Sequence, residues 1–285
     1  MRKFAEKKYS EFDLKFDDYN MTIGARTYVM GILNATPDSF SDGGKFNEVQ
    51  AGVKHALLMV EQGADIIDVG GESTRPGAPE VSKEDELLRV VPLIEAIRAN
   101  VNVPISIDTY KAHVAEAALQ AGANIVNDVW GLQREPEIAA VAARAGAPVI
   151  AMHNQIGTEY TEDIISAMIK FFEKSIDIAL TAGVPKEHII LDPGIGFGKT
   201  PEQNVVVMGR LHELHVLGYP ILLGTSRKSM IGKILDLPSD ERVEGTIATN
   251  VLGVMAGMEF VRVHDVQENL RAVKVADAIV RGWNG

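Results

Sequence analysis

Eight short apolar runs, separated by longer stretches with helical periodicity, constrain the fold of this chain more than any other feature. The runs are rich in isoleucine and valine and are apolar on both faces, which is typical of strands in a parallel sheet that is covered on both sides. Between them, apolar residues recur at spacings of three and four, as they do in helices. The runs occupy residues 28–33, 65–70, 104–108, 124–128, 148–153, 188–192, 220–224 and 259–264.

Eight successive strand–helix units predict an α/β fold, a closed (β/α)8 TIM barrel, and such barrels typically need about 250 residues. We assign residues 27–285 to the barrel domain. Residues 1–26 precede the first strand, and we expect them to form a short β-hairpin-like extension that caps the barrel. The main alternative is an open doubly wound sheet. That fold usually carries a G-x-G-x-x-G turn after its first strand, whereas this chain has NATPDSF at residues 34–40.

Composition narrows the class of protein. The formal net charge is −11, which argues against general nucleic-acid binding because such binding requires a basic face. The chain has no cysteine, so disulfides and cysteine metal sites are excluded and a cytoplasmic location is expected. No apolar run is long enough for a transmembrane helix, and the charged N-terminus lacks the apolar segment of a secretory signal. We therefore expect neither a nucleic-acid partner nor a membrane.

Polar residues follow every one of the predicted strands. In barrels of this class the active site lies at the carboxyl ends of the strands, so these residues are expected to share one ligand site. In chain order they are Asn34, the segment 70–77, Asp108, Asn127 with Asp128, His153 with Asn154, Asp192, the segment 224–229, and Arg262 with His264.

Asp108, Asn127 and Asp192 form one subset, since each ends an apolar run and its side chain is expected to be buried. A buried carboxylate must be paired or hydrogen-bonded. Several acceptors around one pocket could bind the row of N–H donors at an amino-pyrimidine edge. The alternative for Asp108 is a cap on the following helix, and for Asp128 that structural role is the favoured one.

Arg75, Lys228, Arg262 and His264 form a second subset, of cations. Arg262 and His264 are two residues apart, so both point to the same face of the last strand. Because the arginine fork suits phosphate oxygens, we expect an anion site here, although His264 could instead be a core histidine. Four other histidines are expected at the solvent: His55, His113, His212 and His215.

A glycine-rich turn, DPGIGFGKT, occupies residues 192–200. Glycines let a backbone approach a ligand closely. The turn lacks the G-x(4)-G-K-[ST] spacing of a nucleotide-triphosphate loop, and the chain has no G-x-S-x-G elbow and no H-E-x-x-H helix. Nucleotide-triphosphate, serine-hydrolase and zinc-protease chemistry are therefore not indicated.

Seven segments together resemble one known family. They are MGILNATPDSFSDGG, DVGGESTRPG, PISIDTYK, NDVWG, LDPGIGFGKT, LLGTSRKSMIG and VRVHDV. From Tyr28 onward the chain is similar to bacterial dihydropteroate synthases, with small departures at Ala35 and Met230. The resemblance implies a (β/α)8 barrel, commonly a homodimer, that joins 6-hydroxymethyl-7,8-dihydropterin diphosphate to p-aminobenzoate. The products are 7,8-dihydropteroate and diphosphate, in folate biosynthesis, with Mg²⁺ as cofactor and with sulfonamides as inhibitors.

The resemblance also implies roles for individual residues. Pterin binding falls on Asp108, Asn127, Met152, Asp192, Phe197 and Lys228. Diphosphate binding falls on Asn34, Arg75, Arg262 and His264, with Asn34 as the metal ligand. p-Aminobenzoate binding falls on Phe40, Ser41, Thr74, Arg75, Pro76, Lys228 and Ser229. Catalytic roles fall on Lys228, Asp42, Arg262 and His264, and the segment TPDSFSDGG (36–44) is expected to act as a lid.

The expected chemistry is a dissociative, SN1-like displacement. Diphosphate leaves the pterin methylene carbon once its charge is neutralised, and the aniline nitrogen of p-aminobenzoate then attacks. An aniline is unprotonated at neutral pH, so no strong general base is needed. The alternative enzyme is a pterin-dependent methyltransferase on a similar barrel, which would not need a diphosphate site. A non-catalytic pterin-binding barrel is a further alternative.

Overall fold

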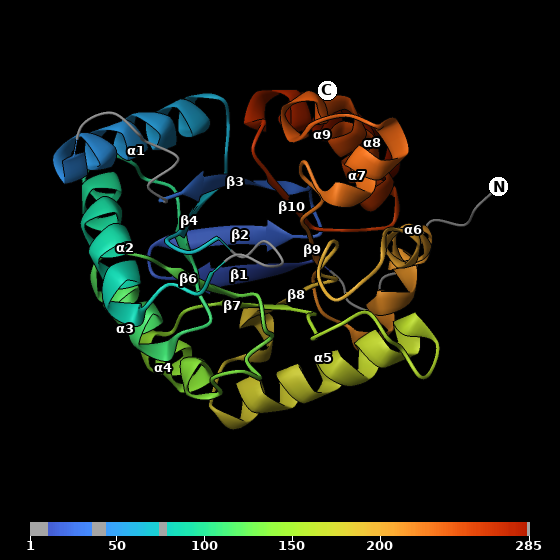
Figure 1. Cartoon of the computed structure of the whole chain (residues 1–285), viewed down its shortest axis with the longest axis horizontal. Coiled ribbons are helices and arrows are strands. Elements are labelled where there is room, and N and C mark those ends of the chain that lie inside the picture. Colours follow the sequence, from blue (N-terminus) through green and yellow to red (C-terminus); the bar gives the residue numbers. More distant parts are fainter. Residues whose placement is uncertain (1–10, 36–43, 74–78, 284–285) are drawn as a thin grey trace.

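The computed structural model describes residues 11–35, 44–73 and 79–283. Eight parallel strands form one sheet in the order β8-β7-β6-β5-β4-β3-β10-β9. A bridge between Leu191 and Ile221 joins the two ends of this order, so the sheet closes into a barrel (Figure 1). The predicted (β/α)8 barrel is thus confirmed, and the open doubly wound sheet is wrong. The strands are β3 (Tyr28–Asn34), β4 (Ile66–Gly70), β5 (Ile105–Asp108), β6 (Ile125–Asp128), β7 (Val149–Met152), β8 (Ile189–Asp192), β9 (Leu222–Leu223) and β10 (Phe260–Val263).

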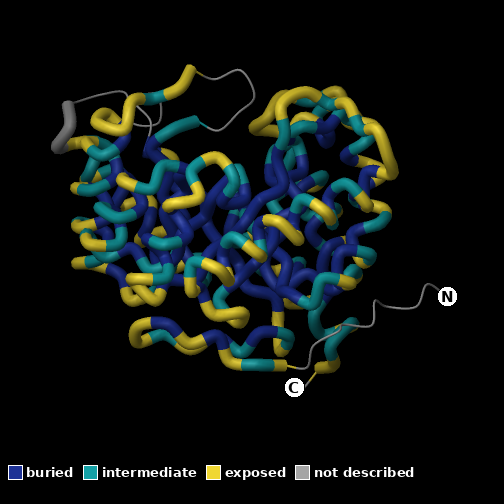
Figure 2. The backbone as a smooth tube through the Cα atoms, turned by 90° about the horizontal axis from the view of Figure 1, so that it is seen from below, coloured by how far each residue is buried: buried dark blue, intermediate teal, exposed yellow. Residues whose placement is uncertain are grey.

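Helices surround the strands (Figure 1), and Figure 2 shows a buried interior inside a rim of more exposed backbone. Local signals fix their ends: Thr200 and Gln203, for example, form a capping box at the start of α6. No helix within the described ranges combines the length and the apolarity that crossing a bilayer requires. The helices are α1 (Gly44–Glu61), α2 (Lys83–Arg98), α3 (Ala112–Gln120), α4 (Glu137–Ala145), α5 (Ile164–Thr181), α6 (Pro201–Gly209), α7 (Ser229–Leu235), α8 (Val243–Met255) and α9 (Val266–Arg281), with 3-10 turns η2 (Lys186–His188), η3 (Leu211–Leu217) and η4 (Ser239–Glu241).

Alternation along the strands gives the barrel an outer and an inner face. Outward residues such as Val126, Val149 and Val261 belong to the large core between strands and helices. Inward residues near the amino ends of the strands form a separate apolar layer: Tyr28, Met30, Ile66, Ile125, Ile150, Ile190, Leu222 and Phe260. Two residues further along the same inward face, several strands carry a polar group: Asp68, Asn127, Asp192 and Arg262. The barrel is therefore apolar at one end and polar at the other.

An antiparallel hairpin, β1 (Phe12–Phe16) with β2 (Tyr19–Ile23), precedes the barrel and crosses it in Figure 1. Its apolar face belongs to the same buried cluster as the inward layer, through Leu14, Phe16, Met21 and Ile23. A polar contact fixes its turn, since Nδ2 of Asn124 donates to Oδ2 of Asp17 at 2.7 Å. The predicted hairpin-like extension is confirmed as a hairpin. The boundary at residue 26 stays a prediction.

One expectation about histidines is wrong. His55, His113 and His212 are exposed as expected, but His215 is only 2% exposed. It lies in η3, and its Nε2 is 2.9 Å from the carbonyl oxygen of Ala256 at the end of α8. The end of α8 covers His215. The sequence pattern of residues 211–217 does not reveal that another helix packs against this ring.

Candidate active site

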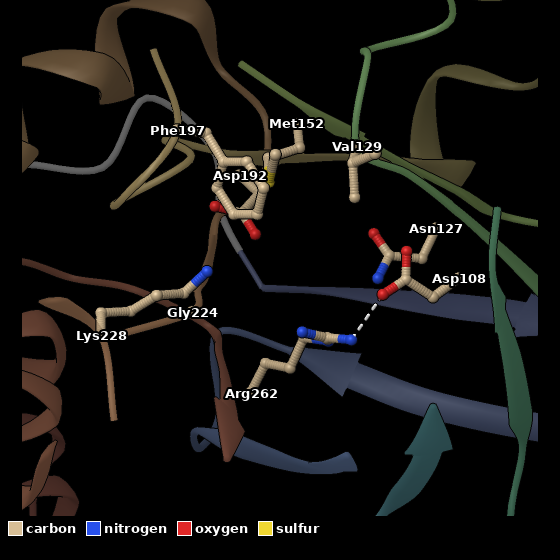
Figure 3. Close-up of a pocket in the computed structure, with 9 residues that line it drawn as sticks. All are labelled: Asp108, Asn127, Val129, Met152, Asp192, Phe197, Gly224, Lys228 and Arg262. Atoms are coloured by element: carbon tan, nitrogen blue, oxygen red, sulfur yellow. Dashed lines mark hydrogen bonds and ion pairs between the residues drawn. The ribbon is translucent and has the colours of Figure 1, made fainter. Parts of the chain in front are cut away.

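A pocket opens at the carboxyl ends of the strands, with about 300 Å³ of space when its opening to solvent is included. It brings together residues from β5, β6, β7, β8 and β10 and from the turns that follow β6, β8 and β9 (Figure 3). All six residues predicted to bind pterin line it, and Arg262 joins them. The complete lining is Asp108, Asn127, Val129, Met152, Asp192, Phe197, Gly224, Lys228 and Arg262.

Asp108 faces the pocket and is ion-paired within it. Nη2 of Arg262 donates to its Oδ2 at 2.6 Å, and its buried Oδ1 has no hydrogen-bond partner in the described part of the chain. Burial raises the pKa of Asp108 to about 7, against the opposing effect of Arg262. The helix-cap alternative for Asp108 is excluded, because α3 begins after Lys111 without a side-chain cap.

Asp128 is structural, as the sequence favoured, but it does not cap the following helix, because α4 begins after Pro136 without a side-chain cap. It turns away from the pocket, and its two oxygens accept from the backbone N–H groups of Trp130 and Leu132, each at 2.7 Å. Burial raises its pKa to about 7, and these two hydrogen bonds act in the opposite direction. Asp128 therefore shapes the β6–α4 turn rather than a ligand site.

Asp68 was not singled out from the sequence, yet it joins two pocket residues. It is fully buried in β4. Its Oδ2 accepts from Nε of Arg262 at 2.6 Å and from Nδ2 of Asn127 at 3.2 Å. A signal was present in DIIDVG, because a carboxylate inside a strand that is buried on both faces must have a partner.

Asp192 and the glycine-rich turn form the opposite wall. Oδ1 of Asp192 accepts from the backbone N–H of Gly194 at 2.7 Å. Phe197, from the same turn, lies under Lys228, whose Nζ is 4.0 Å from the ring centroid. Burial raises the pKa of Asp192, and the Gly194 N–H opposes that shift.

Lys199 anchors this turn from beneath, a role that the sequence did not reveal. Its buried Nζ contacts the carbonyl oxygens of Gly194 and Phe197, each at 3.0 Å, and Nδ1 of His153 at 2.9 Å. Burial lowers the pKa of Lys199 to about 7. Three acceptors match the three donors of an ammonium group, so Lys199 fixes the path of the backbone that carries Phe197.

His264 is joined to the turn after β9 by a double contact with Ser226. Oγ of Ser226 lies 2.9 Å from Nδ1 of His264 and accepts the His264 backbone N–H at 3.1 Å. Arg227 next to it donates to Asp265. Burial first, then Arg262 and Arg227, lower the pKa of His264 to about 3. This shift favours a neutral ring, and the cationic role expected from the sequence stays a prediction.

Asn34 and Ser229 lie outside the pocket lining. Asn34 is exposed at the carboxyl end of β3, and Ser229 is exposed at the start of α7. Within the described residues no three His, Asp or Glu side chains gather as metal ligands. Asn34 offers one neutral oxygen, which fits Mg²⁺ because this ion is usually bound by few protein oxygens together with substrate phosphates. Six predicted site residues lie outside the described residues: Phe40, Ser41, Asp42, Thr74, Arg75 and Pro76.

Comparison with known proteins identifies a family that covers most of the chain. The model of the "Pterin binding enzyme" family matches residues 30–264. A dihydropteroate synthase of Clostridium beijerinckii is 57% identical over 269 residues, which cover 94% of this chain and 100% of that protein. The crystal structure of the Clostridium difficile enzyme, determined in the presence of pteroic acid, has a TM-score of 0.90 and 57% identity and covers 92% of this chain and 99% of that one.

A second solved structure is the Yersinia pestis dihydropteroate synthase in complex with a sulfonamide drug. Its TM-score is 0.88 at 42% identity, with 94% of this chain and 99% of that chain covered. The family match over residues 30–264 includes every residue that lines the pocket. The chain therefore belongs to the pterin-binding enzyme family and, within it, to the dihydropteroate synthases.

Proposed function

We propose that this chain joins 6-hydroxymethyl-7,8-dihydropterin diphosphate to p-aminobenzoate, giving 7,8-dihydropteroate and diphosphate. The observation that carries the proposal is the pocket, in which acceptor groups of Asp108, Asn127 and Asp192 lie at one barrel mouth with the cations Lys228 and Arg262. A dihydropterin ring has a row of N–H donors, and its diphosphate needs cations. The three acceptor residues meet the first need, and the two cations meet the second.

The ring binds, in this proposal, between polar and apolar walls. Asp108, Asn127 and Asp192 accept from its N–H groups, while Met152 and Phe197 contact its faces. Both apolar side chains are buried and line the pocket, which keeps water from the ring. Lys228 is held over Phe197, from where its ammonium reaches into the pocket (Figure 3).

Arg262, His264 and Asn34 serve the diphosphate. Arg262 stays charged, because the Asp68 and Asp108 carboxylates raise its pKa further above its usual range and outweigh its burial. A neutral His264 can donate one N–H to a phosphate oxygen. Asn34 would hold Mg²⁺ together with the diphosphate, and the ion would supply positive charge to the leaving group. Arg75 belongs to the same set by the family resemblance.

The second substrate enters from the rim of the mouth, where Ser229 is exposed. Phe40, Ser41, Thr74, Arg75 and Pro76 complete its site in this proposal, and Asp42 acts as the site closes. The C–O bond to diphosphate breaks with its electron pair on the diphosphate oxygen. The aniline nitrogen then forms the new C–N bond and releases a proton. Lys228 orients the ring throughout, and no general base is required.

Three further features are part of the proposal. Sulfonamides compete with p-aminobenzoate, as the drug complex of the Yersinia pestis relative suggests. The chain forms a homodimer, for which the exposed apolar side chains of α6, α7 and α8 are suited. They are Val205, Val206, Ile234, Leu235, Leu252 and Met255. A chain without cysteine fits a cytoplasmic location.

A diphosphate-release assay tests the function. Release should require both substrates and Mg²⁺, and a sulfonamide should inhibit it in competition with p-aminobenzoate. No release from the intact chain with both substrates and Mg²⁺ would contradict the proposal. Transfer of a methyl group from methyltetrahydrofolate to a corrinoid acceptor would instead favour the methyltransferase alternative, for which the site offers no specific support.

A further inference from the structure

Asp68 lies one step deeper in the barrel than the pocket residues with which it bonds. It is on the inward face of β4, in register with Ser106 of β5, whereas Asp108 pairs with Gly70 two positions further along. Its Oδ2 accepts two hydrogen bonds, from Arg262 and from Asn127. Both partners of this oxygen are N–H groups, which can only donate. Toward both partners, Asp68 is therefore an acceptor only.

This contact fixes the orientation of the Asn127 amide. A primary amide has a donor end and an acceptor end, and only the donor end can face Asp68. The Asn127 side chain therefore turns its Oδ1 away from Asp68 while it lines the pocket, and Figure 3 shows the oxygen and nitrogen of its amide on opposite sides. Without Asp68, rotation of the amide by half a turn would bring the donor end to the ligand.

The same oxygen fixes the Arg262 guanidinium. Nε is bound by Asp68 while Nη2 reaches Asp108, each at 2.6 Å. Two carboxylates from neighbouring strands thus bind two edges of one planar fork, which leaves it little rotational freedom. One buried carboxylate therefore orients two side chains that line the pocket.

We infer that Asp68 is a positioning residue that sets the hydrogen-bond polarity of the pterin pocket. By binding the donor end of Asn127, it makes the wall formed by Asp108, Asn127 and Asp192 a continuous row of acceptors. Such a row selects a ring edge that presents N–H donors and disfavours rings with an acceptor at that place. The inference rests on the proposed function, since it names what orients the ring-binding groups of that site.

The test compares two substitutions of Asp68 by calorimetry with 6-hydroxymethyl-7,8-dihydropterin. Asp68→Asn keeps an acceptor oxygen of the same shape and removes the charge, so the dissociation constant should stay within about threefold of wild type. Asp68→Leu removes the acceptor, and the constant should rise about tenfold or more. A loss of tenfold or more in Asp68→Asn would overturn the inference, because charge and not hydrogen-bond polarity would then carry the effect. This criterion holds even if Asp68→Leu does not fold.

A double-substitution cycle tests the route through Asn127. If Asp68 acts through that amide, then Asp68→Leu combined with Asn127→Ala should weaken binding by less than the product of the two single effects. A full product would overturn the inference. Ser106→Ala is the matched control, because this neighbouring buried hydroxyl has no hydrogen-bond partner among the described residues. The affinity of this variant for 6-hydroxymethyl-7,8-dihydropterin should equal that of wild type. Diphosphate release by wild type tests the proposed function separately.

Discussion

Nη2 of Arg262 donates to Oδ2 of Asp108 at 2.6 Å and so joins β10 to β5 across the mouth of the barrel. The sequence suggested two subsites, with carboxylates for the ring and cations for the diphosphate. The ion pair places a member of each subset in one pocket. Binding of the ring and binding of the leaving group are therefore expected to influence each other through this pair.

The ionisation of Asp108 should make ring binding depend on pH. Its pKa is raised to about 7, so the proton is bound below that pH and the carboxylate accepts an N–H above it. The affinity for 6-hydroxymethyl-7,8-dihydropterin should therefore rise with pH up to about 7 and then level off, with a slope of at most tenfold per pH unit. Calorimetry from pH 5.5 to about 8.5 would measure this.

The matched variant is Asp108→Asn, which keeps the shape and cannot titrate. Its affinity should be lower at pH 8 by about tenfold or more and should not follow the same pH profile. An identical profile in variant and wild type would show that another group, or the ligand itself, titrates.

Removal of Arg262 should weaken binding of the diphosphate-bearing pterin more than binding of the free pterin. Arg262→Ala deletes a diphosphate partner and also leaves Asp68 and Asp108 as neighbouring buried carboxylates without their cation. We expect the affinity for the diphosphate-bearing pterin to fall about 100-fold or more and that for the free pterin about tenfold. Arg210→Ala, at a surface arginine that Asp163 and Glu213 bind, is the control and should change neither. Equal losses for the two ligands would contradict a diphosphate role for Arg262.

Particular residues show what the sequence could and could not predict. Strands and strand-end residues such as Asp192 follow from local periodicity together with the barrel rule, and both were predicted. Asp68 was missed because its partner Arg262 is 194 residues away in the chain, and only closure of the barrel brings them together. Lys199 was missed for a similar reason, since the carbonyl groups that bind it depend on the path of a glycine-rich turn. The His215 error has the same origin, because another element buries that ring.

Ser226 should set the tautomer of His264. Its Oγ accepts the His264 backbone N–H, so its own hydrogen can go to Nδ1 at 2.9 Å, which places the ring proton on Nε2. Ser226→Ala should allow both tautomers and lower kcat about three- to tenfold, and Ser226→Thr should restore most of the loss. Nitrogen chemical shifts of labelled His264 would report the tautomer directly. A wild-type ring with its proton on Nδ1 would contradict this prediction, whatever the kinetics.

Gly194 should tolerate alanine far less well than Gly146, although both have a left-handed backbone, with φ of 63° and 68°. A Cβ at Gly194 would lie 2.0 Å from the carbonyl oxygen of His153, whereas a Cβ at Gly146 would meet nothing within 4 Å. Gly146→Ala should therefore cost only the backbone conformation, about 1 kcal/mol of the free energy of unfolding. Gly194→Ala must in addition move the turn whose N–H binds Asp192.

We expect Gly194→Ala to lower the free energy of unfolding by about 3 kcal/mol or more and to weaken binding of 6-hydroxymethyl-7,8-dihydropterin about tenfold or more. Gly146→Ala should leave that affinity unchanged, because its helix end is remote from the pocket lining. Urea unfolding and calorimetry on the two variants measure the difference. If both variants lost the same stability and kept the same affinity, the close approach of the turn to His153 would not matter to the pocket. A selective loss at Gly194 would show that the glycine is required there for space as well as for its backbone angle.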